Sequence, residues 1–282
     1  MSFDASNKGN MKMYPFCVQY LSEIGVKKGI VDFIDDASES ATNVHKNARE
    51  VLKKHHLNVQ NLTTIGVDNT NVNVGEQHSV YKLFRDEFSD LIKGSCYNHI
   101  LYNSVKQAHK LLTIDVEKIL LSIYAHFSRS AKRIEELKTY YEFYEQDYLV
   151  ILKHIKTRWL SLHTSIERIL KVYNPIKDYF LAQDDCPNEL IQFFSLEEGP
   201  CVLSFLEHIL FIIQKTSLQL QRSYTTAVDL HRLITSLKFE LQQRLDSSFF
   251  GSNCRSKLAS LSKEKAVELK NSFVKFIQRT IE

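Results

Sequence analysis

Asp4 and Asp68 each end a short apolar segment and open a turn rich in asparagine and glycine, in the sequences FDASNKGN and VDNTNVNVG. If the two segments are neighbouring parallel strands, both carboxylates emerge at one sheet edge, where ligands of open α/β sheets gather. Two adjacent carboxylates repel each other unless a proton or a cation intervenes. A divalent cation with oxygen ligands is the natural partner, which favours metal-assisted phosphoryl transfer. The alternative interpretation is two ordinary turn aspartates.

Cys96 and His99 form a second candidate pair, with two residues between them in the sequence CYNHILYN. A structural zinc site needs four ligands, and no second Cys/His pair occurs at motif spacing. His109 and His126 are available but nothing in the spacing requires them, so a packing role competes with zinc binding. The five cysteines are odd in number and widely spaced, and we expect reduced thiols.

The composition indicates an ordinary globular chain that is rich in helix. Its 282 residues are 44% hydrophobic and carry a net charge of +3, which permits a nucleic-acid partner without requiring one. Only 8 glycines and 4 prolines occur, which favours long helices. The apolar stretch 202–213 is too short to span a bilayer, and it contains Glu207 and His208. We therefore expect a protein that is neither secreted nor inserted in a membrane.

The two aspartates are placed by strand and helix signals that alternate over the first hundred residues. The patterns predict a strand stub ending at Asp4 and followed by a polar turn, strands over 13–21, 29–35 and 62–68, helices over 44–55 and 77–92, and a further short strand. After residue 100, helical periodicity dominates, with apolar faces over 116–137, 162–180, 201–221, 225–245 and 263–281. We therefore predict an α/β domain over 1–112, a mixed sheet with flanking helices, and a helical region over 113–282.

Three further motifs follow the aspartates in a fixed order: CYNHILYN, IYAHFSRSAKR and KTRWLSLHTSIERIL. With them the chain resembles transposases of the hAT superfamily, from residue 2 to about residue 250. It is most similar to the transposon-derived proteins that carry a zinc-finger module in front of this region. The resemblance implies an RNase H-like core with a large all-α insertion domain, and an acidic triad that binds Mg²⁺ or Mn²⁺. Asp4 matches the first acid and Asp68 the second.

The chain also departs from the family pattern. It has about two residues of the first strand before Asp4, and it has no zinc finger. The third acid of the family follows the insertion, and none of Glu264, Glu268 and Glu282 stands in a recognisable context, so no third carboxylate is assigned. We expect a relic metal pair without turnover. The alternatives are an active transposase or nuclease whose third acid lies outside this chain, and a domesticated helical module that binds only protein.

The resemblance also gives roles to Arg158 and Trp159. Arg158 would contact a phosphate, and Trp159 would stack on a DNA base flipped out of the duplex. The competing interpretation of this lone tryptophan is a core residue. Expected partners are DNA, or a protein bound by the helical half, and no small-molecule substrate; the family implies a nuclear location. A basic rim for DNA is a further possibility, formed by Lys53, Lys54, Lys106, Lys110, Lys132 and Arg133.

Overall fold

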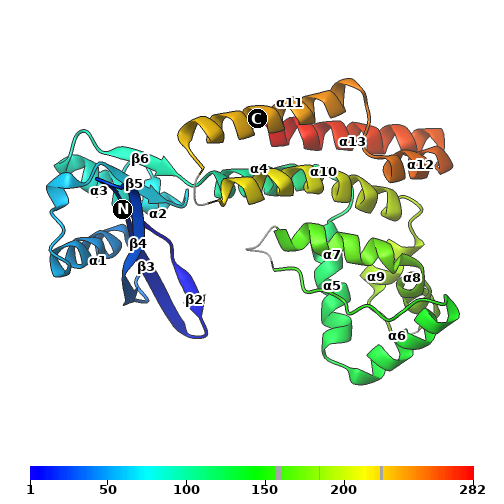
Figure 1. Cartoon of the computed structure of the whole chain (residues 1–282). Helices are drawn as coiled ribbons and strands as arrows, with labels where there is room; N and C mark the ends of the chain where they lie inside the picture. Colours follow the sequence, from blue (N-terminus) through cyan, green and yellow to red (C-terminus); the bar gives the residue numbers. More distant parts are fainter. Residues whose placement is uncertain (156–159, 184, 223–224) are drawn as a thin grey trace. The chain divides into compact units, whose positions relative to one another are not determined.

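The structure, a computed structural model, describes residues 1–155, 160–183, 185–222 and 225–282. It comprises two compact units, Met1–Ile100 and Leu101–Glu282, each of which is described by itself (Figure 1). The division lies earlier than the predicted boundary after residue 112. It falls inside the helix α4 (Tyr97–His109), which begins in the first unit and continues into the second.

The first unit contains all the described strands, which form one mixed sheet. Its elements are β1 (Ser2–Phe3), β2 (Ser6–Lys8), β3 (Met11–Ser22), β4 (Gly25–Asp35), α1 (Ala41–Lys54), the 3₁₀ helix η1 (Val59–Asn61), β5 (Thr64–Val67), α2 (Asn71–Val74), α3 (Val80–Glu87) and β6 (Ile92–Ser95). β1 and β2 pair with one edge of β3, and β4 pairs with the other, all antiparallel. β1 also pairs with β5, and β5 with β6, both parallel. The predicted mixed α/β sheet is confirmed.

The helices α1 and α3 bury their apolar faces in the core of the first unit. Val44, Ala48 and Val51 of α1 are buried there with Phe84 of α3 and with apolar side chains of the sheet. The helix α1 begins at Ala41, before the predicted range of 44–55, because the hydroxyl of Ser40 accepts a hydrogen bond from the amide of Asn43. This packing fixes one face of the sheet against the helices.

Three local predictions in the first unit were wrong. The polar turn predicted after Asp4 instead contains β2, which continues the path of β1 along β3. The helix predicted over 77–92 is shorter, because Ser79 caps α3 and the backbone becomes extended at Phe88. The asparagine-rich turn after Asp68 contains the single-turn helix α2.

The second unit is helical in every element that the structure describes. Its helices are α5 (Val116–Ser128), α6 (Ala131–Phe143), α7 (Leu160–Lys171), α8 (Tyr173–Ala182), α9 (Asn188–Ser195), α10 (Gly199–Leu220), α11 (Ala227–Asp246), α12 (Ser252–Ser260) and α13 (Lys263–Ile281). The apolar stretch 116–137 is interrupted, because Ser130 caps α6. Stretch 162–180 divides at Val172. α11 and α13 run side by side in opposite directions (Figure 1).

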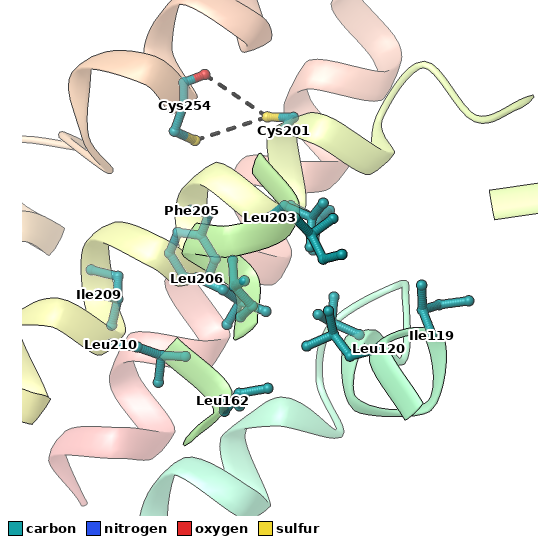
Figure 2. Close-up of a cluster of buried hydrophobic side chains, with 14 of the residues drawn as sticks. Ile119, Leu120, Leu162, Cys201, Leu203, Phe205, Leu206, Ile209, Leu210 and Cys254 are labelled. Carbon is teal, nitrogen blue, oxygen red and sulfur yellow. Dashed lines mark hydrogen bonds between the residues drawn. The ribbon is translucent and has the colours of Figure 1, made fainter. Parts of the chain in front are cut away.

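The helix α10 lies at the centre of the second core. Its side chains gather with those of α5 and α7, as Figure 2 shows for Leu120, Leu162 and Leu206. The ring of Phe205 stacks on Phe273 of α13, with centroids 3.9 Å apart. α10 is long and apolar enough to cross a membrane, but 67% of its apolar window is buried inside the unit. It is therefore best described as a core helix.

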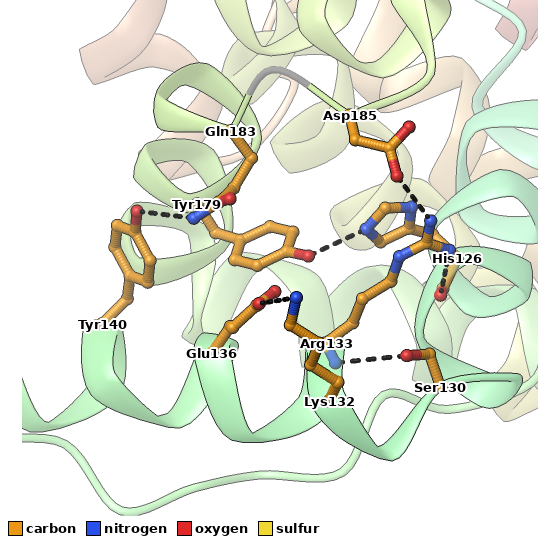
Figure 3. Close-up of polar contacts among 9 residues, drawn as sticks. All are labelled: His126, Ser130, Lys132, Arg133, Glu136, Tyr140, Tyr179, Gln183 and Asp185. Atoms are coloured by element: carbon orange, nitrogen blue, oxygen red, sulfur yellow. Dashed lines mark hydrogen bonds and ion pairs between the residues drawn. The ribbon is translucent and has the colours of Figure 1, made fainter.

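A buried histidine links α5 to α8 in the same unit. His126 is 4% exposed, and its Nε2 lies 3.0 Å from the hydroxyl of Tyr179 (Figure 3). Burial, followed by the charge of Arg133, lowers the pKa of His126 to about 4, against opposing effects of Asp185 and Glu136. His126 is therefore neutral in the folded protein at neutral pH.

We predict that His126 contributes to a loss of stability in acid. Between its unfolded pKa of 6.5 and about 4, the unfolded chain binds more protons at this residue, so the free energy of unfolding falls as the pH falls. Over this pH range, the free energy of unfolding of the His126→Gln variant should fall by up to about 3 kcal/mol less than that of the wild type. Urea unfolding of both proteins at pH 7 and within this window measures the difference. If the free energy of unfolding depends on pH in the same way in both proteins, His126 is not the source of the acid sensitivity.

Candidate functional site

The parallel pairing of β1 with β5 brings Asp4 and Asp68 to the same sheet edge. Ser2 stands opposite Gly66 in this pair, and Asp4 and Asp68 each follow two residues later, directly after their strands end. Both aspartates line one pocket of about 370 Å³. Both carboxylates thus follow adjacent parallel strands and line one pocket within the first unit.

The pocket also contains the second candidate pair, Cys96 and His99. Its remaining lining residues are Ser2, Phe3, Pro15, Cys17, Gly66, Val67, Gly94 and Ser95. A pocket of this volume lies within the range of small-ligand sites, and its lining is mainly apolar with a few convergent polar groups.

The carboxyl group of Asp4 is electrostatically disfavoured in its charged form. Desolvation in the pocket raises its pKa, and the negative charge of Asp68 raises it further. The imidazole of His99 and the amide of Ala5 act in the opposite direction. Asp4 is exposed as a whole residue. The pKa of its carboxyl group is nevertheless raised by desolvation in the pocket and by the charge of Asp68.

The carboxylate of Asp68 is oriented by the turn that follows it. Its Oδ1 accepts hydrogen bonds from the Thr70 amide at 3.3 Å, the Thr70 hydroxyl at 2.8 Å and Nδ2 of Asn73 at 2.5 Å. These contacts leave Oδ2 as the oxygen available to a ligand. The asparagine-rich sequence after Asp68 therefore holds the carboxylate in place.

Cys96 and His99 connect the turn after β5 to the start of α4. The carbonyl of Cys96 accepts a hydrogen bond from Nδ2 of Asn69 at 3.3 Å and from the amide of Ile100 at 3.1 Å. Nδ1 of His99 is buried and has no hydrogen-bond partner among the described residues. The backbone of Cys96 thus has a structural role, whereas the His99 imidazole faces a pocket without a protein partner at Nδ1.

The donor set fits a loosely held cation in part. Asp4 and Asp68 offer carboxylate oxygens, which suit Mg²⁺ or Mn²⁺. Across the described residues, however, no group of three or more His, Cys, Asp or Glu side chains is arranged to hold a metal ion.

Other candidate residues belong to helices and ion pairs described below, or fall outside the described part of the chain. Arg158 and Trp159 fall in the segment 156–159, outside the described residues. Glu264 and Glu268 are on α13, and Glu282 is its C-cap. Of the predicted basic residues, three form ion pairs with acids of their own unit: Lys54 with Asp32, Lys132 with Glu136, and Arg133 with Asp185.

The sequence did not point to four residues that build the pocket floor: Ser2, Cys17, Gly66 and Gly94. They come together through the sheet register, which places Cys17 opposite Ser2, Ser2 opposite Gly66, and Gly66 opposite Gly94. A local signal exists for two of them, because Ser2 and Gly66 precede Asp4 and Asp68 by two residues and so share their side of the strand. Cys17 and Gly94 required the strand pairing to be known.

We predict that Asp4→Asn stabilises the protein in chelator. A raised carboxyl pKa means that the folded state binds more protons above pH 3.8, so the ionised group lowers the free energy of unfolding as the pH rises through its folded pKa. At neutral pH, the variant should gain less than about 1 kcal/mol in free energy of unfolding, since solvent screens the carboxylate. This gain should vanish at a pH below 3.8, where Asp4 is protonated in both states. Thermal melts measure it, with the exposed Asp90→Asn as control. A lower melting temperature for Asp4→Asn would show that this carboxylate is structural.

No protein-family model matches the chain, and no curated protein matches it.

Proposed function

We propose that this chain derives from a hAT-like DNA transposase and that its first unit is an RNase H-like core. The observation that carries the proposal is the position of Asp4 and Asp68 at the ends of two adjacent parallel strands, lining one pocket. A mixed sheet in the first unit and helices throughout the described part of the second support the same origin. In this proposal the second unit corresponds to the helical insertion.

The residues of the pocket would have distinct roles in the ancestral reaction. Asp4 and the Oδ2 oxygen of Asp68 would hold Mg²⁺ or Mn²⁺. When bound, the metal supplies Lewis-acid activation of a water or a 3′-hydroxyl for attack on a phosphodiester. Thr70 and Asn73 keep the Asp68 carboxylate oriented toward the pocket. His99 adds an imidazole beside Asp4. The positive charge of a protonated imidazole would favour the ionised carboxylate of Asp4.

We propose that the present function is binding, with DNA as the ancestral ligand, and that catalysis is lost. Two carboxylates leave part of the metal coordination to water, which weakens both metal affinity and charge stabilisation in the transition state. An active nuclease would need a third acid supplied from beyond this chain. This alternative makes the opposite prediction in a cleavage assay.

The chain should neither cut nor join transposon-end DNA in Mg²⁺ or Mn²⁺. Labelled duplexes that carry a terminal inverted repeat, resolved on denaturing gels, would reveal nicks, hairpins or strand-transfer products. Asp4→Ala is the matched control for contaminating nucleases. Cleavage by the wild type that disappears in Asp4→Ala would establish an active enzyme and overturn the proposed loss of catalysis.

DNA binding is tested at Trp159, the only tryptophan of the chain. If its indole stacks on a base, Trp159→Ala should weaken binding of single-stranded or flap DNA by about 1–3 kcal/mol without changing the melting temperature. Quenching of the wild-type fluorescence by a short oligonucleotide provides a direct measurement. If DNA does not change the wild-type fluorescence and Trp159→Ala lowers the melting temperature, Trp159 is instead a core residue.

A further inference from the structure

A row of small side chains crosses one face of the sheet in the first unit. The register pairs Cys17 with Ser2, Ser2 with Gly66, and Gly66 with Gly94. All four residues line the pocket that holds Asp4. Because opposed residues on adjacent strands share a face, this row forms a shallow floor on the side of the sheet away from α1.

Exposed apolar residues continue this floor along the β3–β4 hairpin. Phe33 pairs with Pro15 and Ile30 pairs with Cys17, and both Pro15 and Cys17 line the pocket. Phe33 is 53% exposed and Ile30 is 58% exposed.

Further out, Leu21 pairs with Val26 on the same face, and these residues are 81% and 60% exposed. We call Leu21, Val26, Ile30 and Phe33 the open strip. The opposite face of β4 is different, because Val31 and Ile34 pack against the core that contains α1. Gln19 and Lys28 pair between the two ends of the open strip on the same face. Large exposed apolar side chains gathered on one sheet face are typical of an interaction surface.

The face of the hairpin is a better docking surface than its edge. The β3–β4 ladder has an irregularity between Phe16 and Cys17, and Lys27 and Lys28 lie on β4. Bulges and edge lysines are the features that discourage an additional strand from pairing with a sheet edge. A partner is therefore expected to lie over the open strip.

The charge at the inner end of the open strip selects the partner. Asp4 and Asp68 follow two adjacent parallel strands and lie in the pocket that Pro15 and Cys17 also line, and two neighbouring carboxylates repel each other. A cationic side chain placed there relieves the repulsion and gains charge-assisted hydrogen bonds. A phosphate backbone without metal would be repelled by the same pair.

We propose that the open strip docks a segment of a partner protein whose apolar side chains cover Ile30 and Phe33 and whose lysine or arginine enters the pocket beside Asp4 and Asp68. The long aliphatic stem of either residue suits the apolar lining, and its charged head reaches the carboxylates. Bound Mg²⁺ or Mn²⁺ and this side chain exclude each other. The proposal does not depend on a transposase origin, since it requires only the sheet face and the acid pair.

The test is a selection of short random peptides displayed on phage against the full chain in chelator. Phage that bind the Ile30→Ser/Phe33→Ser double variant are removed first. Both side chains are exposed, so the variant should keep its fold, and melting temperatures check this. Selected peptides should carry one lysine or arginine among apolar residues. Fluorescence anisotropy then measures their affinity for each variant.

Asp4→Asn and Ile30→Ser should each weaken peptide binding by about tenfold or more. The matched controls Asp90→Asn and Phe239→Ser, the latter with a ring 64% exposed, should leave it unchanged. Mn²⁺ should weaken binding to the wild type. The proposal is overturned if no peptide is enriched over the double variant, if selected peptides lack a cation, or if Asp4→Asn binds them as well as the wild type. Neither Ile30 nor Phe33 enters the DNA cleavage assay, so the two proposals can fail separately.

Discussion

The candidate site depends on two hydrogen bonds made by Met1. Its nitrogen donates to the carbonyl of Thr64 at 2.9 Å, and its carbonyl accepts from the amide of Gly66 at 2.9 Å. These bonds hold the two-residue strand β1 in parallel register with β5, which brings Asp4 level with Asp68. Because successive side chains of a strand alternate between faces, a slip by one residue would turn Asp4 away from Asp68. So short a strand keeps its register only because β3 also binds its other edge.

The pocket side of β1, β5 and β6 holds small residues for a packing reason that also creates the pocket. A Cβ atom on Gly94 would lie 3.1 Å from the carbonyl of Ile65 and 3.2 Å from the Cα of Gly66. A Cβ atom on Gly66 would lie 3.4 Å from that of Ser2. Larger side chains here would push the central strands apart or fill the space beside the carboxylates. The close approach of the backbones and the floor of the pocket therefore have the same cause.

The sequence predicted those parts of the site that depend on local pattern. Asp68 follows a strand that its apolar run predicts, and α1 overlaps the predicted helix 44–55, because each pattern depends only on neighbouring residues. The sequence did not predict β2 after Asp4 or the presence of Cys17 in the pocket. Both follow from pairing with a distant segment, and register between strands is not encoded in either strand alone. The asparagines after Asp68 were predicted as turn residues, but the hydrogen bond from Asn73 to the carboxylate requires the fold of α2.

The same pair of carboxylates can be neutralised by a proton, a metal ion or a cationic side chain, and the surroundings decide among them. A proton is favoured only to the extent that the pocket raises the pKa of Asp4. A metal ion needs several more oxygen or nitrogen ligands than these two residues provide. A lysine or arginine needs only acceptors and an apolar path for its stem, and the open strip beside Pro15 and Cys17 provides that path. The acid pair therefore favours positive charge, and the surrounding side chains decide which kind of cation it holds best.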